Sequence, residues 1–178
     1  MQLFEKVKDN EFLGREFLVW LWFRSDVREG RFSLGEAGDA ELRLNGRIVL
    51  QSDEGEGAEK VICLGENSHL REARFALTES KTITEAKLKL VIGDHEWTFI
   101  LDSTWMNFKS FKSPKVMQDN EKDPEGLFYE KFSLIEQALS AMDFIYSSFI
   151  KVRLSPDWEA VELPALLQWI REGKSSAT

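Results

Sequence analysis

The chain has 178 residues and a formal net charge of -8. This balance disfavours a protein that coats nucleic acid by bulk positive charge, although a local basic face can exist on an acidic chain. A hydrophobic content of 43% with 12% aromatic residues is enough for a real core and excludes a disordered chain. The single cysteine, Cys63, excludes an internal disulfide and fits a reducing, cytoplasmic compartment.

No membrane or secretion signal is expected in the first part of the chain. The opening sequence MQLFEKVKDNEF carries charges in every turn and lacks the long apolar core of a signal peptide. The apolar run 17–23 is much shorter than the roughly 20 residues that a membrane-spanning helix needs.

The aromatic stretch LGREFLVWLWF, at 13–23, predicts a helix over about 11–25. Asn10 is a suitable N-cap, and Arg24 and Arg28 fall near the end where the helix dipole favours cations. Apolar residues occur on both sides of this helix. It is therefore either a central core helix or a helix with one face held for a partner chain.

Alternating patterns after Arg31 predict antiparallel strands. The dipeptide Asn45-Gly46 favours a tight hairpin between AELRL and RIVLQS, and KVICLG, at 60–65, reads as a buried strand that includes Cys63. The acidic, glycine-rich segment 52–60 predicts a loop rather than a metal site. A helix capped by Ser68 follows.

A second hairpin is predicted around Gly93-Asp94, with apolar faces on both of its strands. A polar linker over 117–125 then leads to a long helix over 126–152 and a short helix that ends at Gly173. The apolar stripe of the long helix comprises Leu127, Phe132, Ile135, Leu139, Met142, Ile145 and Phe149. We expect an α+β fold, with a sheet domain at 1–116 and a helical region at 117–178 packed on it.

The sequence offers little chemistry. His69 and His95 lie at a helix start and in a tight turn with no nucleophile signature, and the paired carboxylates lie in solvated loops. We therefore expect no enzyme, no catalytic residue, no metal and no cofactor.

Lysines gather in the section 81–115, which holds six lysines and four carboxylates, a net charge of +2. Alternation places Lys87 and Lys89 on one face of a strand. Such a face is able to follow a phosphate backbone, but alternating lysines also keep edge strands soluble. The candidate phosphate contacts are Lys81, Lys87, Lys89, Lys109 and Lys112.

The order of segments resembles the C-terminal half of the bacterial recombination-associated RdgC family. The similarity is clearest at ESKTITEAKLKLVIGDHEWTFILD, residues 79–102, and looser over about 9–150. The resemblance implies an α+β protein that binds double-stranded DNA with little sequence preference, forms a ring-shaped dimer and associates with the nucleoid. The family is longer than this chain, and it carries a lysine pair where this chain has Cys63-Leu64.

Two functions from different classes follow. The first is a sequence-independent DNA-binding protein that modulates recombination and contacts phosphates through the lysine face. The second is an acidic interaction or assembly module whose helices 11–25 and 126–152 bury aromatic residues against a second copy or another polypeptide.

Overall fold

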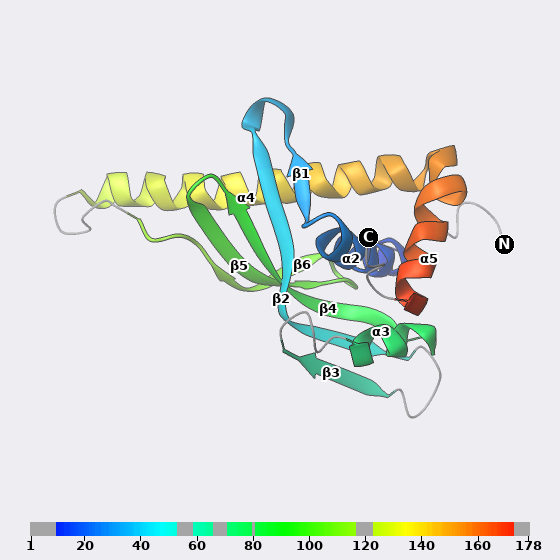
Figure 1. The fold of residues 1–178 in the computed structure, drawn as a ribbon. Helices are drawn as coiled ribbons and strands as arrows, with labels where there is room; N and C mark the ends of the chain where they lie inside the picture. The colour runs from blue at the N-terminus through cyan, green and yellow to red at the C-terminus, as the bar shows by residue number, and fades with distance from the viewer. Residues whose placement is uncertain (1–9, 53–58, 66–70, 80, 117–122, 173–178) are drawn as a thin grey trace.

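Figure 1 shows an α+β fold in which helices cover one face of an antiparallel sheet, as the sequence predicts. The structure is a computed structural model that describes residues 10–52, 59–65, 71–79, 81–116 and 123–172. The predictions on Ser68, the segment 53–58, the linker 117–122 and Gly173 lie outside these residues. So does the boundary proposed between 116 and 117.

The described strands form a six-stranded sheet in the order β1-β2-β4-β5-β6, with β3 also paired to β2. The strands are β1 (Arg31–Ser33), β2 (Asp39–Gln51), β3 (Lys60–Leu64), β4 (Thr82–Ile92), β5 (His95–Asp102) and β6 (Asn107–Lys112). The helices are α2 (Asn10–Val27), α3 (Arg71–Thr78), α4 (Pro124–Arg153) and α5 (Leu163–Glu172), with a 3-10 turn η1 (Gly35–Ala37) and a π-helical turn η3 (Trp158–Glu162). None of these helices has the length and hydropathy needed to cross a membrane.

The hairpin predicted at Asn45-Gly46 is wrong, because β2 continues through this dipeptide as one long strand. Gly46 has a positive φ of 71°. It lies where the register of the pairing between β2 and β4 shifts, between Leu44 and Ile48. The irregularity also marks a change of neighbour on the other edge of β2. Residues 39–41 pair with β1, whereas residues 47–51 pair with β3.

The strand predicted at 60–65 is confirmed over 60–64, but its predicted burial is wrong. β3 pairs with β2 at the edge of the sheet, where Leu64 is 70% exposed and Ile62 is exposed as well. Cys63 is buried, as expected. An apolar run shows that a strand is favourable but does not show which neighbours will cover it.

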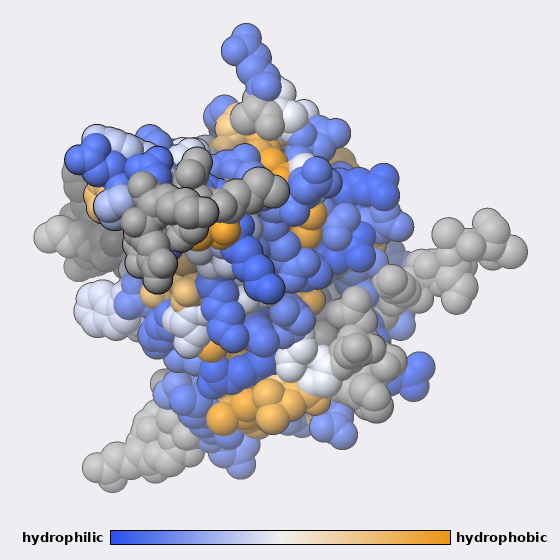
Figure 2. All heavy atoms as spheres, turned by 90° about the vertical axis from the view of Figure 1, so that its left-hand side faces the viewer, coloured by the Kyte–Doolittle hydropathy of each residue, from blue (hydrophilic) through white to orange (hydrophobic). Residues whose placement is uncertain are grey.

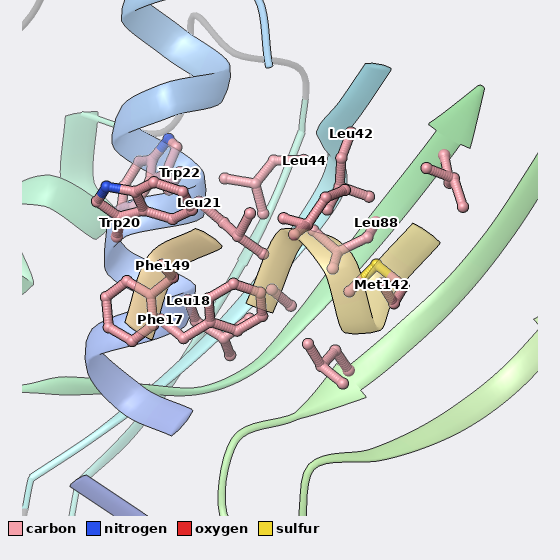
Figure 3. Close-up of a cluster of buried hydrophobic side chains, with 14 of the residues drawn as sticks. Phe17, Leu18, Trp20, Leu21, Trp22, Leu42, Leu44, Leu88, Met142 and Phe149 are labelled. Carbon is pink, nitrogen blue, oxygen red and sulfur yellow. The ribbon is translucent and has the colours of Figure 1, made fainter. Parts of the chain in front are cut away.

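The aromatic helix is a core helix, as the first of its two readings predicts. Asn10 is already helical in α2, so the prediction that it is the N-cap is wrong. Figure 3 shows its side chains packed toward β2, β4 and α4. Six of the seven apolar positions at 17–23 of α2 are at least 96% buried, and Val19 is half-buried; the six are Phe17, Leu18, Trp20, Leu21, Trp22 and Phe23.

Close approach of α2 to the sheet depends on Gly14. A Cβ atom at this position would clash with the carbonyl oxygen of Ser103. Ser103 is fully buried and donates its hydroxyl to the carbonyl oxygen of Ile83 at 3.0 Å. The glycine therefore lets the helix backbone lie directly against the end of β5.

The C-terminal elements η3 and α5 pack against α2. Trp20 donates its indole Nε1–H to the buried carboxylate of Glu162 at 3.0 Å, and Arg24 lies 3.7 Å from the same carboxylate. Burial and the neighbouring Arg28 lower the pKa of Arg24, while Glu162 opposes that shift. In α5, Trp169 packs edge-on against Trp22 with ring centroids 5.0 Å apart.

α4 begins at a well-formed cap. Asp123 accepts a hydrogen bond from the backbone N–H of Gly126 at 2.8 Å, and Pro124 occupies the first turn, where its missing N–H costs nothing. The apolar stripe predicted for this helix is covered only in part by the rest of the chain. Its C-terminal members are buried, but Phe132, Ile135 and Leu139 are exposed.

Candidate interaction surfaces

The strand register places several cations on the sheet face opposite the helices. Arg43, Lys89, Thr98 and Lys112 are partners across β2, β4, β5 and β6, so their side chains share one face in a single row. Lys87 lies two positions from Lys89 on the same face. The sequence predicted that Lys87 and Lys89 share a face but not that Arg43 joins them.

Carboxylates neutralise part of this face. Lys89 pairs with Glu96 at 2.6 Å. Lys109 donates to Asp102 at 2.6 Å and to Glu85 at 2.9 Å, and these two hydrogen bonds raise its pKa. Two of the four lysines that the sheet brings together are therefore already held by acidic side chains.

Asp102 holds the turn between β5 and β6. Its carboxylate accepts hydrogen bonds from the backbone N–H groups of Thr104 at 2.9 Å and Trp105 at 3.3 Å. Burial opposes ionisation, but the hydrogen bonds from Lys109 and from these two N–H groups prevail and lower the pKa of Asp102. Asp102 and Lys109 thus form a structural pair.

The remaining candidate, Lys81, precedes β4 and does not belong to the row. It donates to Glu59 at 2.7 Å, and this hydrogen bond raises its pKa while lowering that of Glu59. The structure therefore brings together four of the five candidate lysines, and Lys87 and Lys112 are those for which no ion pair is found among the described residues.

The N-terminal half of α4 carries the most extensive exposed apolar surface on any described helix. We call it the α4 apolar surface. Its members are between 41% and 68% exposed and are Phe128, Tyr129, Phe132, Ile135 and Leu139. The rings of Phe128 and Phe132 are stacked, with centroids 6.4 Å apart and an interplanar angle of 19°. Three of these residues, Phe132, Ile135 and Leu139, belong to the apolar stripe predicted from the sequence, and a 3.6-residue period alone does not show what covers such a stripe.

A cavity of about 280 Å³ lies at the C-terminal end of the α4 apolar surface. Leu139 belongs both to the surface and to the wall of the cavity. The wall is apolar except for the Asp143 carboxylate and the Tyr146 hydroxyl, and burial raises the pKa of Tyr146. The complete lining is Phe17, Leu101, Met106, Phe108, Leu139, Met142, Asp143 and Tyr146.

A smaller apolar surface lies at β3, where Ile62 and Leu64 point away from the core. In Figure 2, apolar side chains gather at the lower end of a mostly hydrophilic face, at the height of β3 in Figure 1. Cys63, between them, is buried, and this burial followed by the charge of Glu72 raises the pKa of its thiol. A raised thiol pKa disfavours the reactive thiolate.

Within the described residues, no group of three or more histidine, cysteine or acidic side chains is placed to hold a metal ion. The Nδ1 atom of His95 lies 3.3 Å from the side-chain oxygen of Gln137, and its ring contacts Trp97 edge-on. His95 is thus a surface residue at the β4–β5 turn. His69 lies outside the described residues.

These features define an α+β domain with an open, partly neutralised sheet face and an apolar helix face. No known family model matches the chain, and no curated protein sequence matches it. The resemblance to the RdgC family therefore stays a prediction.

Proposed function

We propose that this chain is a protein-interaction module that binds another polypeptide through the α4 apolar surface. The observation that carries the proposal is the exposure of five large apolar side chains, three of them aromatic, on consecutive turns of one helix. At about 200 Å² for each fully exposed side chain, the exposed parts come to roughly 500 Å². Apolar patches of this size on monomers are often functional.

The arrangement fits recognition of a helix or an apolar segment. Phe128, Phe132, Ile135 and Leu139 recur at alternating steps of four and three residues, the spacing of a helix–helix seam. The rings of Phe128 and Phe132 are stacked and together offer a continuous aromatic face to a partner. A partner would gain most of its affinity from these two aromatic side chains.

Site-specific photo-crosslinking tests the proposal. A photo-reactive phenylalanine analogue replaces Phe132 in one variant and Phe75, an equally exposed phenylalanine on α3, in the control. We expect covalent adducts with a polypeptide from position 132 and none from position 75. Adding Phe128→Ser to the first variant should abolish the adducts. Equal labelling from both positions, or none from position 132, would contradict the proposal.

A second candidate function is DNA binding by the open sheet face, as in the RdgC-like hypothesis. The observation that favours it is the row of Arg43, Lys89 and Lys112 across four strands, with Lys87 beside it. Three of the five candidate lysines are engaged by carboxylates, and the net charge of the chain is -8. We therefore rank this function below the first.

A salt series with a random-sequence duplex tests the DNA-binding candidate. The variant Lys87→Glu/Lys112→Glu changes two cations of the sheet face, and Lys60→Glu/Lys131→Glu makes the same charge change at exposed positions elsewhere. Phosphate binding predicts affinity that falls steeply as salt rises and that is lost in the first variant alone. Equal loss in both variants would indicate a general charge effect, and no binding at low salt would remove this candidate.

A further inference from the structure

We propose that the α4 apolar surface binds a second copy of this chain, with the two α4 helices antiparallel and Phe128 of each copy over the cavity beside Leu139 of the other. This inference rests on the proposed function, because it names the partner of the same surface. The two ends of that surface differ in shape. One end carries projecting aromatic rings and the other opens into a cavity.

Antiparallel packing about a two-fold axis brings these unlike ends together. Phe128 and Leu139 stand about 16 Å apart along the helix at 1.5 Å per residue. An axis midway between them places Phe128 of one copy opposite Leu139 of the other, and Phe132 opposite Ile135. The surface is then self-complementary, as a two-fold interface requires. Parallel packing would instead place the two cavities at one level, away from either Phe128.

The cavity is large enough for an aromatic ring. Its volume is about 280 Å³, and an apolar cavity of about 150 Å³ accommodates benzene. Met106 and Phe108, from the β5–β6 region, supply apolar wall opposite Leu139 and Met142 of α4. A ring held between a strand region and a helix loses contact with water on both faces, which is the setting in which aromatic anchors contribute most.

The area is sufficient for a weak dimer. If each copy covers roughly 500 Å² of exposed apolar side chain, the pair buries roughly 1,000 Å², which is near the lower bound for a specific interface. The association is therefore expected to be concentration-dependent rather than permanent. The position of the surface on one rigid helix keeps the cost of ordering low.

Sedimentation equilibrium of the full chain tests self-association, over about 1 to 500 μM because interfaces of this size are weak. We expect a monomer–dimer equilibrium. Phe128→Ser should raise the dissociation constant roughly tenfold to a hundredfold, since it removes a buried aromatic side chain at each end of the interface. The matched control Phe75→Ser should leave the dissociation constant unchanged. Both side chains are exposed, so neither variant should fail to fold.

The orientation is tested by distances between spin labels in the dimer, in a Cys63→Ser background. Labels replace Glu136, near the two-fold axis, or Glu125, in the first turn of α4. Antiparallel packing predicts that the distance between Glu125 labels exceeds that between Glu136 labels by roughly 15 to 20 Å, from the helical rise. A parallel dimer would give nearly equal distances at the two positions and would overturn the inference.

A chain that stays monomeric up to the highest concentration also overturns the inference. The crosslinking experiment then decides the fate of the proposed function separately. Adducts from position 132 to a different polypeptide would keep the interaction module and exclude the second copy as its partner. Adducts that contain two copies of this chain support both proposals.

Discussion

The large apolar side chains of α4 lie in two environments. Leu127 and Leu134 of its N-terminal half are buried, as are Met142, Ile145 and Phe149 of its C-terminal half, whereas Phe128 and Phe132 are exposed to solvent. An apolar stripe therefore runs along the helix, but only part of it is covered by the chain itself. Apolar periodicity in a sequence thus identifies a helix surface that needs to be covered but does not identify what covers it.

α2 packs against the C-terminal half of α4. Phe17 of α2 packs against Tyr146 at 4.9 Å and Phe149 at 5.4 Å between ring centroids, and Glu16 pairs with Arg153 at 2.6 Å. These contacts all involve the C-terminal half of α4. In Figure 1, the N-terminal half of α4 extends past α2 on the other side of the molecule.

The largest difference in stability is expected between a substitution at a buried position of α4 and one at an exposed position. Phe149→Ala should lower the free energy of unfolding by about 3 to 5 kcal/mol, because it empties a fully buried position. Phe132→Ala should change it by no more than about 0.5 kcal/mol. Denaturant titration measures both. Equal losses would show that Phe132 is covered within the monomer, and the comparison would fail.

A smaller loss of stability is expected from breaking the hydrogen bond between Trp20 of α2 and Glu162 near the C-terminal helix. Trp20→Phe keeps an aromatic ring but removes the donor to the buried Glu162 carboxylate, and should cost about 1.5 to 3 kcal/mol. Trp169→Phe removes a similar bond to Asp26 at a part-buried site and should cost less. A larger loss for Trp169→Phe would show that Glu162 finds another donor.

The β5–β6 turn, next to the cavity where the two halves of α4 meet, gives a pH-dependent test. Asp102→Ala should cost about 1 to 2 kcal/mol at neutral pH, because two backbone N–H groups lose their acceptor. The pKa of Asp102 is lowered in the folded state, so its contribution is present above its ordinary pKa of about 4 and is lost as the pH falls through the folded value. The difference in unfolding free energy between wild type and variant should therefore shrink below about pH 4. A constant difference from pH 7 to pH 2 would contradict this assignment.

The smallest effect on stability should come from removing the exposed rings. Phe128→Ser/Phe132→Ser should leave the unfolding free energy of the monomer within about 1 kcal/mol of wild type. The double variant should also bind less of an apolar fluorescent dye, because the α4 apolar surface is reduced. Unchanged dye binding would place the main accessible apolar surface elsewhere, with Ile62 and Leu64 of β3 as the next site to change.

Sequence patterns predicted the fold class and the β4–β5 hairpin, where strict alternation and the Gly93-Asp94 turn agree. They failed at Asn45-Gly46 because the positive φ that favours a hairpin also suits an irregularity inside a long strand. The shared face of Lys87 and Lys89 was predictable from alternation. Their partners were not, since the register that brings Arg43 and Glu96 beside Lys89 is set by tertiary pairing.

The contact between Trp20 and Glu162 spans 142 positions of the chain, and that between Asp26 and Trp169 spans 143. The first described helix to leave the ribosome therefore waits for more than 140 further residues before these contacts form. Until α5 emerges, Trp22 lacks the ring of Trp169 against which it packs. Until then the nascent chain presents an aromatic helix, which makes α2 the segment that a chaperone acting during translation would be expected to bind.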